Sequence, residues 1–334
     1  MSELVYGFTP APAAASRSRL AETLRTDLNR LQTETVTGQA EDPANALDGA
    51  TAAGRARAQR LDRINAWQEA AEFGEMRARA QQDTLGVVRD TAQSLTDSLR
   101  TAASVATAGA RTLAIDEARA ALEGMLSALN QSFGGRALFA GDAPDAAAFA
   151  DDDAVIAAIG TAIGGSTDPA AIETAVAGIF DDPVTYAGTV YVGGTGSAPG
   201  VGVDTGETVD DAVSGLDEGI RGVLRETATV AALAGSQGDD DVLARQLSTA
   251  ADRLTSEIAR LEISNARAGQ AEASLADAQT RLAAERTALA IAAAEATAVD
   301  PFAAAAAFNA TESALSTLFA ATGRLSQLTL ANFL

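Results

Sequence analysis

The sequence predicts a mainly α-helical protein, a long coiled-coil-like bundle formed by an N-terminal and a C-terminal arm with a small mixed or β-rich inserted domain. Two observations predict the arms: apolar residues recur at heptad spacing in the N-terminal half of the 334-residue chain, and again in its C-terminal half. A third predicts the insert: 15 of the 45 acidic residues, but none of the 24 basic ones, lie between Arg136 and Arg221. We therefore expect an N-terminal arm over residues 1–136, an acidic insert over 137–216, and a C-terminal arm over 217–334 that packs on the first.

The N-terminal arm begins with a short amphipathic segment that carries Leu20, Leu24, Leu28 and Leu31 on one helical face. Residues 37–43 (TGQAEDP) then break the helix and allow a restart. A long run with alternating three- and four-residue spacing follows, and a further helix is expected over 113–133, up to a glycine pair. The members of the long run are Ile64, Trp67, Ala71, Ala78, Leu85, Val88, Ala92, Leu95, Leu99, Ala102 and Ala106.

The insert carries weaker signals of both kinds of secondary structure. We expect short helices over 154–163 and 170–180, and a returning helix over 217–234. Residues 184–192 alternate β-branched or aromatic with small residues and end at a glycine pair, which predicts a strand, and 200–203 predicts another. The expected module is therefore small and mixed.

The C-terminal arm shows the clearest periodicity, with leucines separated by seven or fourteen residues. They are Leu247, Leu254, Leu261, Leu275, Leu282 and Leu289. A companion row four residues on is polar in its centre, at Asn265, Glu272 and Gln279, and coiled coils use such polar positions to fix register. An ordinary long bundle helix would show the same pattern. Asp300 and Pro301 predict the cap and first residue of a last helix.

Composition restricts the chemistry. The chain contains no Lys, His or Cys, so all its basic residues are Arg, and its net charge is −21. Zinc sites of Cys and His, thiol nucleophiles, Ser-His-Asp triads and disulfides are thereby excluded. The acidity argues against nucleic acid or an anionic membrane as partner. We expect no enzyme activity, cofactor or metal, and no membrane-spanning segment or conventional secretory signal.

Three short features suggest ligand sites, but each has a simpler interpretation. Residues 151–153 and 239–241 are Asp triplets that lack the spaced ligands of a calcium loop, and solvated loops explain them better. Residues 193–196 (GGTG) resemble a phosphate-binding loop, but no Lys and no helix start follow them.

Interaction between subunits is the remaining use for long Ala/Leu helices. The C-terminus carries an apolar tail, and exposed patches of this kind usually have a partner. The candidate subunit-packing residues are Leu20, Leu24, Leu28, Leu31, Leu247, Leu254, Leu261, Leu275, Leu282, Leu289, Leu325, Leu328, Leu330, Phe333 and Leu334.

Five motifs in both arms and the insert resemble the family of flagellins and flagellin-like hook-filament junction proteins (flagellar hook-associated protein of type three). The TGQAEDP breaker at 37–43 resembles the one after the family's first helix, and GRALFAG at 135–141 resembles the hinge into its variable insert. Tyr186 to Gly188 and Val203 to Gly206 look like strand and turn pieces of that insert. The ending LSQLTLANFL at 325–334 is closer to the junction protein than to flagellin.

The resemblance implies a structural component of the bacterial flagellum that joins the hook-side junction to the flagellin filament. It implies as partners a hook-side junction protein, flagellin, copies of the chain in a ring and an export chaperone. It also implies an extracellular location reached through the flagellar type III apparatus, and terminal arms that order on assembly.

Three alternatives remain open. The nearest is a flagellin filament subunit, which would polymerise when seeded. A soluble coiled-coil scaffold or signalling protein would be a stable helical dimer and would give the acidic insert no role. A secreted carboxylate-based hydrolase would need a cleft in the insert.

Overall fold

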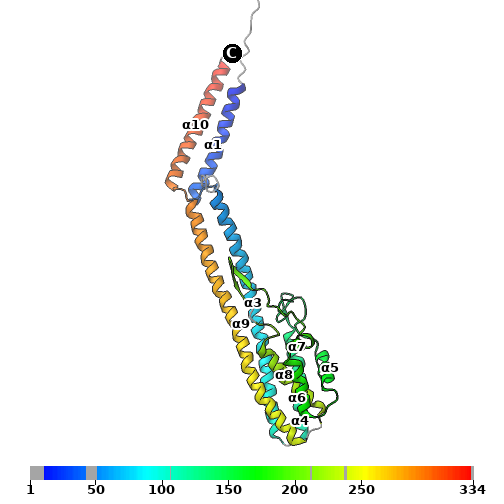
Figure 1. The fold of residues 1–334 in the computed structure, drawn as a ribbon. Helices are drawn as coiled ribbons and strands as arrows, with labels where there is room; N and C mark the ends of the chain where they lie inside the picture. The colour runs from blue at the N-terminus through cyan, green and yellow to red at the C-terminus, as the bar shows by residue number, and fades with distance from the viewer. Residues whose placement is uncertain (1–10, 43–50, 106, 211–212, 237–238, 332–334) are drawn as a thin grey trace, which may run out of the picture. The chain divides into compact units, whose positions relative to one another are not determined.

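The structure, a computed structural model, describes residues 11–42, 51–105, 107–210, 213–236 and 239–331 and is mainly helical, which confirms the predicted fold class (Figure 1). Its elements in chain order are α1 (Ala11–Thr37), α3 (Thr51–Ser104), α4 (Ala108–Leu129), β1 (Ser132–Phe133), β2 (Arg136–Ala137), α5 (Asp152–Ile163), α6 (Pro169–Phe180), α7 (Pro183–Thr189), β3 (Val201–Asp204), β4 (Glu207–Val209), α8 (Glu218–Ala232), the 3₁₀ turn η1 (Leu233–Gly235), α9 (Asp240–Ala296) and α10 (Pro301–Ala331).

The chain divides into two compact units. Unit 1 comprises Met1–Arg63 and Ala284–Leu334, and unit 2 comprises Ile64–Ala283. Helices α3 and α9 each contribute residues to both. The domain boundaries expected at 136/137 and 216/217 were drawn from amino-acid composition, whereas the two units are separated by their contacts. The expected boundaries therefore stay a prediction.

Unit 1 contains the first and last helices, and α1 packs along α10. Helix α1 ends where Gly38 takes a φ of 67°, a conformation that favours glycine. A short antiparallel bridge then pairs Gln39 with Ala298. Asp300 accepts a hydrogen bond from the Phe302 amide at 2.9 Å, so the predicted cap of the last helix is confirmed.

Unit 2 holds the large core. The predicted apolar run of the N-terminal arm is buried almost throughout, with Ile64, Val88 and Leu99 at 0% exposure, while Trp67 is half-buried and Ala106 lies outside the described residues. The core also contains the largest fully buried side chains of the described chain, which are Tyr186, Tyr191, Phe139, Phe149 and Phe180. Heptad spacing therefore predicted the buried face of α3 correctly.

Helices α5, α6 and α8 confirm three of the helices expected around the insert, and β3 confirms the strand expected at 200–203. Helix α4 starts five residues earlier and ends four residues earlier than expected, at Leu129, with Asn130 as its C-cap. The Asn130 side chain exchanges two hydrogen bonds with the Phe149 backbone, at 2.8 and 3.1 Å, and so fixes the return of the chain.

The strand predicted over 184–192 is wrong, because most of this segment forms α7. Its alternating pattern was outweighed by a helix start: Asp182 accepts hydrogen bonds from the amides of Val184 and Thr185, and Pro183 occupies the first turn. Only Tyr191 pairs in β fashion, in an isolated bridge to Phe149. The capping interactions of Asp182 and the position of Pro183 therefore favoured a helix in a segment whose residue types favour a strand.

The β3–β4 hairpin covers a stretch of α3 and α9 in unit 2. Val203 is fully buried against Ala71, Leu275 and Ala278 in a second apolar cluster. A side chain added at Gly74 would come within 2.9 Å of Val201, so this glycine lets the hairpin lie close to α3. Among the described residues, no helix is both long and apolar enough to cross a membrane.

Candidate assembly surfaces

The leucine row of α1 is buried progressively toward the end of the helix. Leu20 is 50% exposed, Leu24 and Leu28 are half-buried, and Leu31 is only 7% exposed. The sequence therefore located one apolar face, but in the structure this face is fully buried only at Leu31. The part nearer the N-terminus keeps apolar area in contact with solvent.

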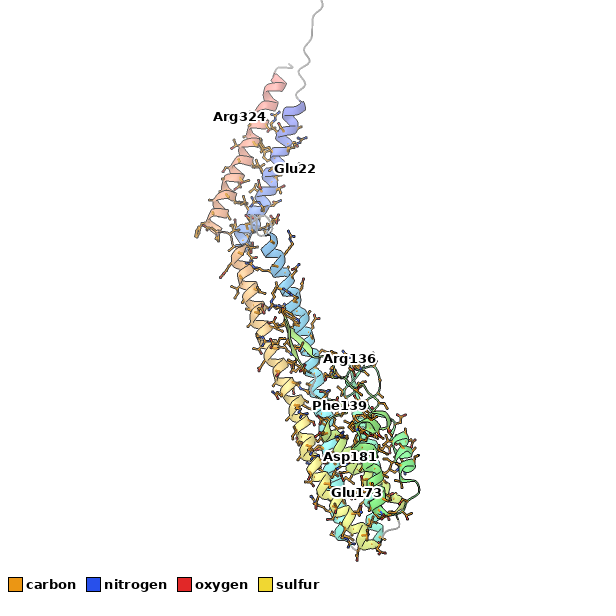
Figure 2. All side chains as sticks on the ribbon, viewed as in Figure 1. Glu22, Arg136, Phe139, Glu173, Asp181 and Arg324 are labelled. Atoms are coloured by element: carbon orange, nitrogen blue, oxygen red, sulfur yellow. The ribbon has the colours of Figure 1, made fainter. Side chains whose placement is uncertain are left out.

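A groove of about 520 Å³ runs between α1 and α10 in unit 1. Its wall on α10 is formed by Leu318, Phe319 and Thr322, and Arg25 of α1 places its guanidinium 5.4 Å from the centre of the Phe319 ring. Figure 2 labels Glu22, another groove residue on α1. The groove is thus lined by an aromatic side chain and by charged side chains of both signs.

Helix α10 exposes an unusually apolar surface. Its residues 301–331 include only two charged side chains, Glu312 and Arg324. Among the side chains described on it, Ala304 is buried at 3% exposure, whereas Phe302 is 87% and Phe319 48% exposed. A soluble helix usually places such residues against another surface, so α10 has the composition of a helix with a missing neighbour.

Polar side chains make hydrogen bonds and ion pairs within α1, at its end, and between α3 and α9 in unit 1. Glu34, 6% exposed, accepts hydrogen bonds from Arg30 at 3.1 Å, and the Glu41 amide lies 3.4 Å from the same carboxylate. Arg60 of α3 pairs with Glu285 of α9 through two contacts of 2.6 and 2.8 Å. These contacts give unit 1 defined geometry with little apolar core.

The heptad leucines of α9 are buried in the chain itself. Leu247, Leu254 and Leu261 belong to the main core, Leu275 to the cluster under the hairpin, Leu282 is 1% exposed and Leu289 is half-buried. Contacts within one chain therefore account for most of this row, and contacts between subunits at these leucines stay a prediction.

The terminal candidates are described less fully. Leu325, Leu328 and Leu330 fall within α10, but their side chains are not described. Phe333 and Leu334 lie outside the described residues.

Two members of the polar row predicted beside the heptad leucines, Glu272 and Gln279, find partners on α3, whereas the buried side-chain oxygen of Asn265 has no hydrogen-bond partner among the described residues. Gln279 donates to Glu75 at 2.7 Å, and Glu272 accepts from Gln82 at 2.5 Å and from Arg79 at 2.7 Å. The hydrogen bond from Gln82, followed by that from Arg79, lowers the pKa of Glu272. The sequence pattern found this row, but its partners could not be identified without the register of the two helices.

The suggested ligand loops have structural uses. Asp152 and Asp153 lie in the first turn of α5, and Asp240 and Asp241 in that of α9, where acidic residues stabilise the helix dipole. The glycine loop is filled by the carboxylate of Asp142, which accepts from the Gly196 amide at 3.0 Å. Within the described ranges, no group of three acidic side chains could hold a metal ion.

One cluster was missed by sequence reasoning. Arg225 of α8 contacts Asp181, Glu226 and Glu257 at 2.8, 2.6 and 3.9 Å, and the last two residues are buried. No motif marks such a cluster, because its members come from α8, α9 and the end of α6 and meet only in the fold.

Comparisons with known proteins add no relative to this picture. No family model matches the sequence, and neither the curated proteins nor the solved structures contain a match.

Proposed function

We propose that this chain is a structural component of the bacterial flagellum that joins the hook-side junction to the flagellin filament through packing of its terminal helices. The order of motifs along both arms supports the family, since TGQAEDP, GRALFAG and LSQLTLANFL occur where flagellin-like junction proteins have their counterparts. The partners in this proposal are the hook-side junction protein, flagellin, further copies of the chain and an export chaperone. The location is extracellular, after export through the flagellar type III apparatus.

The observation that carries the proposal is the incomplete packing of unit 1. Leu20, Phe302 and Phe319 keep 50%, 87% and 48% of their surface exposed, although α1 and α10 already pack on each other. Burying apolar area contributes about 25 cal/mol per Å², so neighbouring helices would gain by covering these side chains. A subunit that completes its fold on assembly needs a surface of this kind.

Deletion of the gene tests the proposal. We expect cells with intact hooks but no filaments, and flagellin released into the medium. Restoring the gene on a plasmid should restore filaments. Normal filaments in the deletion strain would contradict a junction role.

A flagellin filament subunit is the nearest alternative, because the same exposed α10 surface would serve a filament. Seeding separates the two roles: a flagellin lengthens filament fragments by itself, whereas a junction subunit does not. The sequence ending at 325–334 favours the junction. A soluble coiled-coil scaffold is disfavoured, because it assigns no use to the exposed apolar surface of α10.

A further inference from the structure

Helices α8 and α9 approach each other closely along a glycine face in unit 2. A side chain added at Gly219 would come within 2.7 Å of the Leu261 backbone. One added at Gly222 would overlap the carboxylate of Glu257. The carboxylate of Glu257 therefore lies directly against the backbone of α8, away from water.

A second carboxylate shares this interface. Glu226 of α8 is 2% exposed and Glu257 of α9 is 6% exposed. Arg225 places one terminal nitrogen 2.6 Å from a Glu226 oxygen and 3.9 Å from a Glu257 oxygen. We call Arg225, Glu226 and Glu257 the buried triad.

Other charged groups surround the buried triad from three elements. At the end of α6, Asp181 accepts from Arg225 at 2.8 Å, and Glu173 of α6 pairs with Arg253 of α9; Figure 2 labels both acids. On α9, Arg260 contacts Glu257 at 3.1 Å.

Three more charged side chains lie near these groups. Arg245 of α9 lines a cavity of about 210 Å³ together with Glu226, and Glu218 and Arg221 of α8 line one of about 160 Å³ on the Glu257 side. Arg221 lies 6.0 Å from the Tyr186 ring. On the α4 side of α8, the Thr227 hydroxyl contacts the Met125 sulfur at 3.9 Å. Helix α5 contributes the apolar side chains of Val155 and Ile159 to the same core.

Within the buried triad, two carboxylates lie beside one guanidinium, and Arg260 is the closer partner of Glu257, at 3.1 Å. Two carboxylates are nearly inaccessible, whereas one guanidinium, with 27% of its side chain exposed, lies between them. Arg253 and Arg260 lie closer to solvent, with 44% and 59% of their side chains exposed, and so compensate less. Burial raises the pKa of Glu226, although the hydrogen bond and charge of Arg225 oppose this effect.

We propose that the contact between α8 and α9 is an acid-tightened joint, in which Glu226 takes up one proton as the pH falls and so removes one of the two buried negative charges beside Arg225. The proton comes from solvent and binds a carboxylate oxygen, so no other bond changes. Because the folded protein holds this proton more readily than the unfolded chain, folding gains stability as the pH falls, and that gain is lost as the pH rises again.

The joint has a use if the proposed function holds, and this consequence rests on it. A subunit that is exported unfolded and then assembles benefits from a fold that opens readily at neutral pH. Buried ion clusters can make a fold easier to open, because the free-energy cost of removing charges from water can exceed the stabilisation that imperfect ion pairing provides.

The test uses the purified full chain and needs no flagellum, so its outcome is independent of the proposed function. Urea unfolding followed by the fluorescence of Trp67, the single tryptophan, is measured from pH 8 to pH 5 for wild type and for Glu226→Gln. At pH 8 we expect the variant to have the smaller unfolding constant, by about tenfold for each pH unit by which the carboxyl titration is raised. This difference should shrink steadily toward pH 5.

The matched control is Glu207→Gln, which removes an exposed carboxylate paired with Arg281 at 3.1 Å. Its curve should run parallel to that of wild type at all pH values. A gap between Glu226→Gln and wild type that stays constant with pH, or widens toward pH 5, would overturn the proposal.

If the variant does not fold, carbon NMR of wild type decides. A titration of the Glu226 carboxyl above the range of free glutamate supports the joint, and one within or below that range refutes it.

Discussion

Units 1 and 2 differ in how completely they bury their apolar side chains. Unit 2 encloses five aromatic side chains at 1% exposure or less, together with the buried faces of α3, α4, α8 and α9. Among the described residues of unit 1, the buried apolar side chains are Leu31 and Ala304. The difference indicates that unit 2 can be stable by itself, whereas unit 1 gains much from further neighbours.

Removing a large aromatic side chain should show this contrast most strongly. Phe139 is fully buried in unit 2, so Phe139→Ala should lower the free energy of unfolding by about 3–5 kcal/mol. In unit 1, Phe319→Ala should cost less than about 1 kcal/mol in the free chain, because Phe319 is already half exposed. Urea unfolding of both variants measures this, and similar losses would refute the contrast.

The glycine face of α8 should give the next largest effect. Gly219→Ala forces a methyl group against the Leu261 backbone and should destabilise unit 2 by about 1–3 kcal/mol. Gly178 of α6 has open space around it, so Gly178→Ala should stabilise by up to about 1 kcal/mol. If both substitutions shift the urea midpoint in the same direction, the close approach of α8 and α9 does not limit stability.

Hydrogen exchange should separate the two units without any substitution. Local opening requires little loss of buried area in α1 and α10, so their amides should exchange about 100-fold or more faster than those of α4 and α8. Mass spectrometry of peptides from the free chain measures this ratio. Equal protection in all four helices would indicate that unit 1 is already complete.

The smallest effect concerns the polar row between α3 and α9. Hydrogen bonds from Gln82 and Arg79 lower the pKa of Glu272, so its contribution is present at neutral pH and lost as the pH falls through that lowered pKa. Glu272→Gln should therefore cost below about 1 kcal/mol at pH 7, since Arg79 is largely exposed, and this cost should decrease as the pH falls through the lowered pKa. A loss that persists at low pH would assign Glu272 a packing role instead.

Periodicity was a reliable guide wherever one face of a helix is buried. The spacing around Leu85, Leu95 and Leu254 identified core positions of α3 and α9 without any tertiary information. The strand expected over 184–192 failed, because residue types in so short a segment compete with the helix cap at Asp182. Charge position was also informative, but only the fold brings Arg225, Glu226 and Glu257 together.

Only part of the candidate assembly surface could be predicted from the sequence. The leucines of α1 and the apolar character of α10 are evident from sequence, because composition alone leaves α10 with two charged side chains. Which face remains open could not be derived, because it depends on how α1 lies against α10 and where Phe319 meets Arg25.

The most direct test of the account is complementation of the deletion strain with a charge placed on the open face of α10. Ala310→Glu introduces a carboxylate at an exposed position, and Ala154→Glu makes the same change on α5. Immunoblots measure release of each variant, and electron microscopy counts filaments. We predict that both variants are released like wild type, but that only Ala154→Glu restores filaments. Full restoration by Ala310→Glu would contradict the claim that this surface meets other subunits.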